Sequence, residues 1–422
     1  MPQNNFDQVI LSLQSDRALV PANQTNDRYI LLTVQSPERD LKTDRLPLNL
    51  SLIIDRSGSM SGKKLEYVKE AVTHVLRMLT PTDRLSIVTY DDEVKLLAAS
   101  QALSSAARQR LIEQVRQIRS GGMTNLSGGW LTGCEQIKEY QSQEYVNRAF
   151  LLTDGLANQG ITDHEELVFE GKKLRKNGIS TSTFGVGNTF NEFLLQGIAD
   201  GGGGHFYFID TPNQIPNYFK GELGELLTTV AREMTLDISL PAGVTVELLN
   251  EIPTESSDGR LRVLLGDTYA GDSRTLLFKV SLPACNLRQY LSLGFTLQYE
   301  DAQHRRAVAV KTDPVIFSAV SENAYHQQAV NEAVLREAAE LETERAKMEA
   351  LRQVDQRNLA GARATVKKAK SALADFSIAA APLEAELDKL ADGLEGMTVQ
   401  ERKTMHYGTY NRQQSRKDYK KQ

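Results

Sequence analysis

The 422-residue sequence has few cysteines, little excess charge and no long hydrophobic run. Its 2 cysteines, Cys134 and Cys285, fall in different expected domains and lack metal-ligand spacing, which argues against a disulfide or a cysteine metal site. We therefore expect free thiols in a reducing compartment. The formal net charge of −5 is close to balanced for this length, so it does not point to nucleic acid as a partner.

No segment is long and apolar enough to span a membrane, and the first residues lack the basic start and apolar stretch of a signal peptide. These absences predict a cytoplasmic protein that does not cross a membrane. The hydrophobic content of 41% is sufficient for true cores, and a chain of this length predicts two or three domains.

The motifs of several enzyme classes are also missing. The sequence has no Gly-x-Ser-x-Gly elbow, no His-Glu-x-x-His pair and no Gly-x-x-x-x-Gly-Lys-Ser loop. The glycine run at 201–204 has the composition of a phosphate loop, but no lysine follows it and a strand pattern comes next. We interpret this run as a flexible turn.

An apolar run that begins near Asn49 stops abruptly at three oxygen-bearing side chains in alternate positions, Asp55, Ser57 and Ser59. Such a run is typical of a buried parallel strand, and open α/β sheets bind ligands at the carboxyl ends of their strands. Oxygen ligands favour a hard cation such as Mg²⁺ over zinc or copper. Because Ser and Asp are also common turn residues, this triplet alone is a weak signal.

Two later segments strengthen the signal. A second loop supplies Thr124, and a strand pattern at 149–153 ends at Asp154. The three segments together offer two carboxylates and three hydroxyls. This set resembles the metal-ion-dependent adhesion site of the von Willebrand factor A (VWA) domain family, whose motif is Asp-x-Ser-x-Ser, then Thr, then Asp.

The resemblance covers roughly residues 46 to 230 and fills all five motif positions. It implies that the serines and Thr124 would contact a metal directly, and that Asp55 and Asp154 would act directly or through water. It also implies an open metal position that accepts an acidic side chain of a partner protein. Two carboxylates make a poor calcium cage, so we expect Mg²⁺, with Mn²⁺ and Ca²⁺ as alternatives.

Strand and helix patterns alternate through residues 47–232. Apolar residues recur at helical spacing in 61–79, a strand pattern follows at 85–90, and the cycle repeats up to a helix from about 212. Strands that alternate with helices predict a parallel sheet covered on both faces. We therefore predict an α/β fold in which a doubly wound, Rossmann-like VWA domain occupies this part of the chain.

The flanking segments, residues 1–46 and 233–320, carry short β-rich runs separated by turn residues, as an antiparallel β-sandwich requires. We predict that the two segments pair as one β-sandwich into which the VWA domain is inserted. An extended N-terminal arm is the alternative.

The last hundred residues contain two segments of different composition. Residues 321–396 form a helical region, whose apolar faces we expect to pack on each other or on the sandwich rather than on a partner helix. Residues 397–422 are expected to form a basic flexible tail, since positions 401–422 hold seven Lys and Arg against two acidic residues.

The function most consistent with these patterns is that of a non-enzymatic protein that binds another protein through a carboxylate and a bound metal. Two alternatives stay open. One is an accessory subunit of an ATPase-driven metal-insertion or remodelling complex, as in many intracellular relatives of the family. The other is a metal-dependent hydrolase with His164 as the candidate histidine near the site. Enzymes that use such an aspartate for phosphoryl transfer, however, place a second carboxylate where this chain has Ser57.

Overall fold

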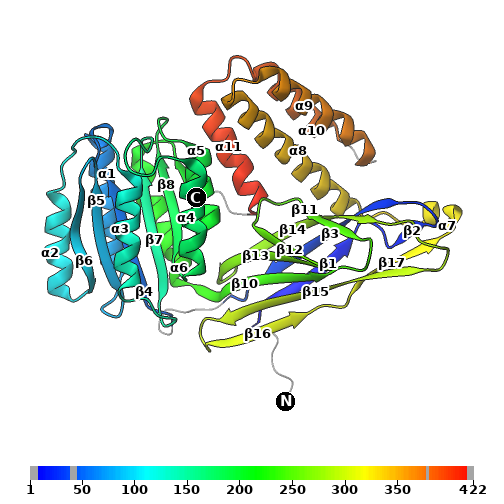
Figure 1. The fold of residues 1–422 in the computed structure, drawn as a ribbon, viewed down its shortest axis with the longest axis horizontal. Helices are drawn as coiled ribbons and strands as arrows, with labels where there is room; N and C mark the ends of the chain where they lie inside the picture. Colours follow the sequence, from blue (N-terminus) through cyan, green and yellow to red (C-terminus); the bar gives the residue numbers. More distant parts are fainter. Residues whose placement is uncertain (1–7, 39–44, 377–379, 416–422) are drawn as a thin grey trace. The chain divides into compact units, whose positions relative to one another are not determined.

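The computed structural model describes residues 8–38, 45–376 and 380–415. They divide into two units (Figure 1), an α/β unit of residues 45–229 and a two-sheet unit of residues 8–38 and 230–415. The chain forms the first strands of the two-sheet unit, passes through the α/β unit and then returns. The α/β unit is thus an insertion in the sequence of the other unit.

One six-stranded sheet lies at the centre of the α/β unit as described, in the order β6-β5-β4-β7-β8-β9. Neighbouring strands are parallel except for β5 and β6. Strands β4 and β7 are buried along their whole length, because helices cover both faces of the sheet (Figure 1). The strands are β4 (Leu48–Asp55), β5 (Arg84–Tyr90), β6 (Val94–Ala102), β7 (Val146–Thr153), β8 (Ser180–Val186) and β9 (Gly203–Ile209).

The helices of this unit pack on the sheet and on one another. Helix α1 packs beside α2 and α6, α4 packs beside α5, and α3 lies against β4 and β5. The doubly wound α/β fold that the alternating pattern predicted is confirmed. The helices are α1 (Lys63–Met78), α2 (Ser105–Arg116), α3 (Leu126–Lys138), α4 (His164–Lys176), α5 (Glu192–Gly202) and α6 (Ile215–Leu227), with short 3₁₀ turns at η2 (Gly58–Met60) and η3 (Pro212–Gln214).

The glycine run at 201–204 is not a flexible turn, and that interpretation was wrong. Helix α5 continues through Gly202, and Gly203 ends it in the left-handed conformation with a φ of +67°. Gly204 already belongs to β9, where a Cβ atom would lie only 2.1 Å from the carbonyl oxygen of Thr181. Close approach of β9 to the backbone of β8 therefore requires glycine here.

Two sheets share one hydrophobic core in the described part of the two-sheet unit. One sheet has the order β1-β3-β14-β11, and the other has the order β12-β13-β10-β15-β17-β2, with β16 paired to β15. Leu32 and Phe278 of the first sheet meet Ile238 and Phe295 of the second in this core. The strands are β1 (Ile10–Ser15), β2 (Leu19–Pro21), β3 (Asn26–Gln35), β10 (Thr229–Ser239), β11 (Thr245–Leu248), β12 (Thr254–Ser257), β13 (Arg260–Tyr269), β14 (Ser273–Leu282), β15 (Tyr290–Asp301), β16 (Arg306–Lys311) and β17 (Val315–Val320).

Strands from either side of the inserted unit lie next to each other in the first of these sheets. Strand β3 pairs antiparallel with β14 along its whole length, from Asn26 with Leu282 to Gln35 with Ser273. Strand β1 extends the same sheet on the other edge of β3. The segment from β1 to β3 is therefore part of a sheet and not an extended arm.

Helices cover the outer face of this sheet. Leu31 of β3 and Leu277 of β14 join a second hydrophobic core with residues of α8, α9 and α10. The expectation that the apolar helix faces pack on each other and on the neighbouring sheet is confirmed. No helix in the described ranges combines the length and the apolar character that crossing a bilayer requires. The helices are α7 (Glu322–Gln327), α8 (Glu332–Asp355), α9 (Leu359–Leu373), α10 (Ala381–Gly393) and α11 (Val399–Gln413), with a 3₁₀ turn η4 (Ala374–Phe376).

The segment predicted as a flexible basic tail is instead the regular helix α11, so that prediction was wrong for residues 399–413. Thr398 and Glu401 form a capping box at its start. Tyr407 and Tyr410, three positions apart, are buried on one side of the helix. The net basic composition hid this aromatic stripe; residues 416–422 lie outside the described part of the chain.

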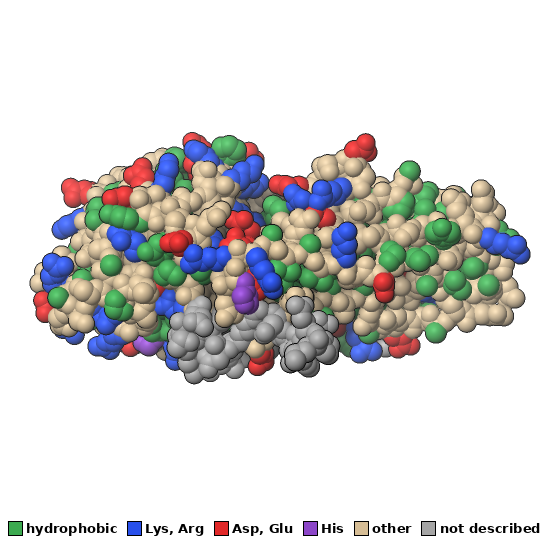
Figure 2. Space-filling model, turned by 90° about the horizontal axis from the view of Figure 1, so that it is seen from below, with side chains coloured by type: hydrophobic (Ala, Val, Ile, Leu, Met, Phe, Trp, Pro, Cys, Tyr) green, Lys and Arg blue, Asp and Glu red, His purple; other side chains and the backbone are tan. Residues whose placement is uncertain are grey.

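Charged side chains are unevenly distributed on the face of the molecule drawn in Figure 2. Figure 2 shows Lys, Arg, Asp and Glu side chains gathered over the α/β unit, at the left, and mostly uncharged or hydrophobic side chains over the two-sheet unit, at the right. Tyr290 and Ile316 are among the exposed hydrophobic residues of the two-sheet unit, at 68% and 46% exposure.

Candidate metal centre

The carboxyl edge of the parallel sheet, where its strands end, carries a fully buried aspartate. Asp55 is the last residue of β4 and has 0% exposure. Its Oδ1 accepts a hydrogen bond from the backbone N–H of Ser57 at 2.8 Å, and its Oδ2 accepts one from the Thr153 hydroxyl at 2.6 Å. The carboxylate is thus fixed from two sides before any ligand is considered.

A chain of short contacts links Asp55 to the second predicted carboxylate. The hydroxyls of Ser57 and Ser59 lie 3.2 Å apart, and Ser59 donates to Oδ1 of Asp154 at 2.6 Å. Asp154 follows the last residue of β7 and, like Asp55, has 0% exposure. Lys64, in the first turn of α1, donates to its Oδ2.

Thr124 completes the group from a third loop. A Cβ atom placed on Gly155 would lie 3.5 Å from the Thr124 hydroxyl and 3.9 Å from the Ser59 hydroxyl. Thr124 itself is 4% exposed, and its backbone N–H donates to the Asn158 side chain at 2.9 Å. The structure therefore brings all five predicted residues together, and a glycine keeps the space beside two of the hydroxyls open.

Backbone contacts hold the Thr124 loop against the loop that carries the serines. The N–H of Gly58 donates to the Gly122 carbonyl at 3.0 Å, and the N–H of Gly121 donates to the Arg56 carbonyl at 2.7 Å. Asp91, just after β5, supports both loops. Its carboxylate accepts from the Arg56 guanidinium at 2.8 Å and from the Gly122 N–H at 3.1 Å.

The contacts of Asp91 explain why a glycine stands at position 121 of the Thr124 loop. A Cβ atom on Gly121 would lie 1.7 Å from Oδ2 of Asp91, and one on Gly122 would lie 1.8 Å from Oδ1 of Asp92. Asp91 cannot swing away easily, because its carboxylate also accepts from the Glu93 N–H at 2.9 Å. A side chain at position 121 would therefore push the loop, and Thr124 with it, out of place, whereas the exposed Asp92 side chain can turn away from one at position 122.

The electrostatics of the site favour a cation. Burial, with a smaller contribution from the nearby Asp154 carboxylate, raises the pKa of Asp55 from its usual 3.8 to about 6. Two buried carboxylates so close together repel each other, and the Lys64 ammonium contacts only Asp154. A divalent ion would relieve this repulsion and the cost of burial.

The donor set fits a hard divalent cation. Asp55, Ser57, Ser59, Thr124 and Asp154 offer only carboxylate and hydroxyl oxygens, the ligand type that Mg²⁺ prefers in proteins. These residues could hold the ion, and the ion would act as a Lewis acid toward an incoming oxygen ligand. Ser59 and Gly155 are not buried, so this side of the site is open to solvent.

Several residues of the site were not identified from the sequence. Arg56, Lys64, Asp91 and Thr153 each contact a predicted residue or fix its loop. Asp91 carried a usable signal, because it follows a parallel strand directly, as Asp154 does. His164, the candidate histidine of a hydrolase, lies exposed in the first turn of α4, next to Gly197 of α5.

Comparison with known proteins gives the same picture. The family model for the von Willebrand factor type A domain matches residues 49–221. Escherichia coli (strain K12) protein YfbK is 32% identical over 267 residues, which are 61% of this chain and 46% of YfbK. The Synechocystis protein sll0103 is 26% identical over 299 residues, 68% of this chain and 70% of its own length. The chain thus spans less than half the length of the first of these relatives.

Solved structures resemble the fold of nearly the whole chain. A von Willebrand factor type A protein from Catenulispora acidiphila has a TM-score of 0.70 at 17% identity and covers 93% of this chain and 91% of its own. The ArnB paralog VWA2 from Sulfolobus acidocaldarius has a TM-score of 0.61 at 17% identity and covers 95% of this chain and 99% of its own. At such identity the likeness concerns the fold alone. Residues 49–221 of this chain form a von Willebrand factor type A domain.

Proposed function

We propose that this protein binds another protein through a divalent cation, which Asp55, Ser57, Ser59, Thr124 and Asp154 hold and to which the partner supplies a carboxylate. The observation that carries the proposal is the meeting of two fully buried carboxylates with three hydroxyls at one solvent-facing edge of the sheet. Mg²⁺ is the proposed ion, because every donor is a hard oxygen. Von Willebrand factor type A domains are protein-interaction modules, which agrees with this role.

The surroundings of the site also suit a protein partner. Met123, beside Thr124, is 52% exposed, and Leu156, close after Asp154, is 55% exposed. Exposed hydrophobic side chains next to a polar centre are typical of an interaction surface. We propose that these two residues contact apolar groups of the partner on either side of its carboxylate.

Binding is a better proposal than hydrolysis for this arrangement. Asp55 accepts hydrogen bonds on both oxygens and is fully buried, so it is poorly placed to attack a substrate. Of the two nearby groups that could transfer a proton in a hydrolase, Lys64 is hydrogen-bonded to Asp154 and His164 lies exposed on α4. A role as the binding subunit of an ATPase-driven complex is compatible with this proposal and would identify the partner as a separate chain.

A reducing location such as the cytoplasm fits the two cysteines. Cys134 lies in the α/β unit and Cys285 in the two-sheet unit, and both are buried, free thiols. We therefore propose a cytoplasmic partner.

Calorimetry combined with affinity capture tests the proposal. Metal-stripped protein should take up Mg²⁺ or Mn²⁺, and Asp154→Ala should not. The wild type should retain specific proteins from a native lysate in Mg²⁺ but lose them in EDTA, and Asp154→Ala should not retain them at all. Asp258→Asn, which removes an exposed carboxylate from the two-sheet unit, is the matched control and should behave as the wild type.

Two results would contradict the proposal. One is the same set of retained proteins in Mg²⁺, in EDTA and with Asp154→Ala. The other is phosphatase or esterase turnover that requires Mg²⁺ and disappears in Asp55→Ala, which would favour a hydrolase.

A further inference from the structure

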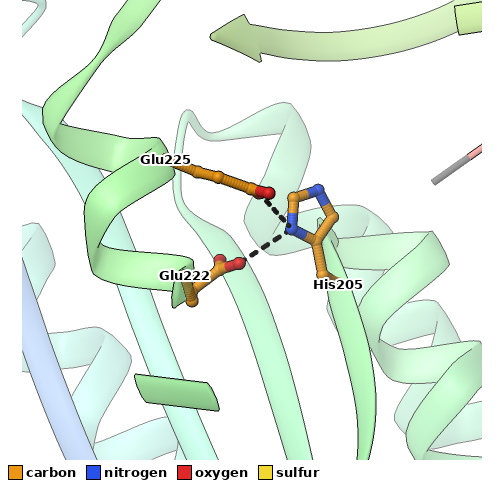
Figure 3. Close-up of side chains that lie close together, drawn as sticks. All are labelled: His205, Glu222 and Glu225. Atoms are coloured by element: carbon orange, nitrogen blue, oxygen red, sulfur yellow. Dashed lines mark hydrogen bonds and ion pairs between the residues drawn. The ribbon is translucent and has the colours of Figure 1, made fainter. Parts of the chain in front are cut away.

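Three potential metal ligands meet at the amino edge of the α/β sheet, where the parallel strands begin. His205 is the third residue of β9, and Glu222 and Glu225 project toward it from α6 (Figure 3). Asp55 and Asp154 lie at the other ends of their strands. We propose that His205, Glu222 and Glu225 bind a second metal ion, Zn²⁺, at a site separate from the carboxyl-edge centre.

The spacing of the three ligand atoms suits a small ion. Nδ1 of His205 lies 2.8 Å from Oε2 of Glu222 and 3.6 Å from Oε2 of Glu225. All three atoms lie within 4.8 Å of one another. Zinc bonds to nitrogen and oxygen are about 2.1 Å long, so two ligand atoms of a tetrahedral site are about 3.4 Å apart. The observed separations bracket this value, and Figure 3 shows both carboxylates approaching the same ring nitrogen.

Further hydrogen bonds orient the first carboxylate. Glu222 has 0% exposure, and its Oε2 accepts from the Tyr207 hydroxyl at 2.5 Å. Its Oε1 accepts from the Ser182 hydroxyl at 2.5 Å, and Ser182 in turn accepts from the backbone N–H of His205 at 3.2 Å. Metal-binding carboxylates and imidazoles commonly have such orienting partners. Glu222 is therefore oriented before the ion enters.

The local charge and ligand types select the ion. Glu222 and Glu225 are three positions apart, so they lie on one face of α6, near the helix end at Leu227. The carbonyl end of a helix is partly negative and attracts a cation. An imidazole nitrogen favours Zn²⁺ over Mg²⁺ and Ca²⁺, which prefer oxygen.

The partial exposure of Glu225 makes the proposed site reachable from solvent. Its side chain is 24% exposed, whereas Glu222 is enclosed. A bound ion would join α6, the last helix of the α/β unit, to the edge strand β9. The role we assign to it is structural, as a clamp on the segment that leads into β10.

Metal titration of the untagged full chain tests this site. We would use Asp154→Asn as the background, so that the carboxyl-edge centre does not contribute, and measure Zn²⁺ by competition with a chromophoric chelator. Co²⁺ would serve as the spectroscopic probe. The expected result is one Zn²⁺ per chain and visible Co²⁺ absorption. Adding Glu225→Gln should weaken Zn²⁺ binding at least tenfold, and Glu165→Gln, which changes an exposed carboxylate of α4, should not.

Glu225 is the preferred target because its partial exposure makes the variant tolerable to the fold, and circular dichroism would verify this. His205→Gln provides a second variant with the same expected loss. The proposal would be overturned if the Asp154→Asn background took up no Zn²⁺, or if Glu225→Gln weakened binding less than tenfold. Neither outcome depends on whether a partner protein binds at Asp154.

Discussion

The buried carboxylates at the two edges of the α/β sheet have different kinds of partners. At the carboxyl edge, Asp55 and Asp154 are surrounded by hydroxyls and backbone N–H groups, with one lysine in contact. At the amino edge, Glu222 is paired directly with an imidazole and held by a tyrosine. The first edge leaves negative charge to be neutralised by a ligand from outside, whereas the second can share a proton within the protein.

This difference indicates at which edge the buried carboxylates need a cation to neutralise their charge. The repulsion between Asp55 and Asp154 persists until a cation arrives, so metal binding there is coupled to function. At the amino edge His205 and Glu222 are hydrogen-bonded to each other without an ion, so a bound Zn²⁺ would replace that hydrogen bond with a metal bond to each residue. The following predictions separate the two edges, from the largest expected effect to the smallest.

Gly121→Ala should damage only the carboxyl edge. The new Cβ atom would lie 1.7 Å from Oδ2 of Asp91, so the Thr124 loop must move. We expect a loss of stability of about 2 to 3 kcal/mol, within the range for overpacked sites, and Mg²⁺ binding at least tenfold weaker by calorimetry. Gly224→Ala on α6 is the control, since a Cβ there meets nothing within 4 Å. Unchanged Mg²⁺ affinity in Gly121→Ala would show that the two loops are not rigidly joined.

Asp55→Asn should stabilise the metal-free protein. Burial raises the pKa of Asp55 to about 6, so the folded protein holds this proton more tightly than the unfolded chain. Stability therefore falls as the pH rises from about 4 to about 6, and stays reduced above that. A shift of about two units corresponds to about 3 kcal/mol. Losing a hydrogen bond offsets about 1 kcal/mol, which leaves a net gain of about 2 kcal/mol at pH 7.5.

Denaturant unfolding in EDTA at pH 7.5 and pH 4.5 measures this gain. The advantage of Asp55→Asn over the wild type should shrink toward zero at the lower pH, where the wild-type carboxyl is protonated in the folded state. An advantage of equal size at both values would exclude Asp55 as its cause.

Met123→Ser combined with Leu156→Ser should weaken partner binding roughly tenfold, about 1.4 kcal/mol, because two exposed apolar contacts are lost. Mg²⁺ affinity should not change, since neither side chain belongs to the donor set. The control is Phe169→Ser, which removes an even more exposed apolar group, 64% accessible, from α4. Surface plasmon resonance with a captured partner would show the difference, and a matching loss in the control would exclude a specific contact.

Lys64→Gln should raise Mg²⁺ affinity about threefold, because its ammonium competes for Oδ2 of Asp154 and repels a neighbouring cation. The side chain is 27% exposed, so solvent screening keeps the effect small. Lys63→Gln, at the exposed neighbouring position, should leave the affinity unchanged in the same calorimetric titration. Weaker binding in Lys64→Gln would mean that the lysine supports the metal site.

That Asp55 and Asp154 would lie near each other could be predicted from the sequence, because both positions follow from the strand pattern. Asp55 and Asp154 each come directly after an apolar run, and the carboxyl ends of parallel strands share one edge. The residues that fix the loops were harder to find. Arg56 and Lys64 contact the site with long side chains. Whether those side chains reach it depends on how α1 and the loops pack, and no periodic sequence pattern indicates this.

The amino edge and the last helix could not be predicted for a different reason. His205 and Glu222 lie on different elements, and the pairing depends on how α6 returns to the sheet. Helix α11 was missed because its charge dominated its composition, although Tyr407 and Tyr410 recur at helical spacing. At this helix the spacing of the buried aromatic residues indicates the structure, and the net charge does not.

The pairing of β3 with β14 has a consequence for synthesis of the chain. The strands β1 and β3 leave the ribosome before the α/β unit, but the partner strand β14 emerges only after that whole unit has been made. At about 5–20 residues per second this delay lasts some tens of seconds. During that time one edge of β3 and its apolar side chains are uncovered, so a chaperone that shields this strand would protect the nascent chain from aggregation.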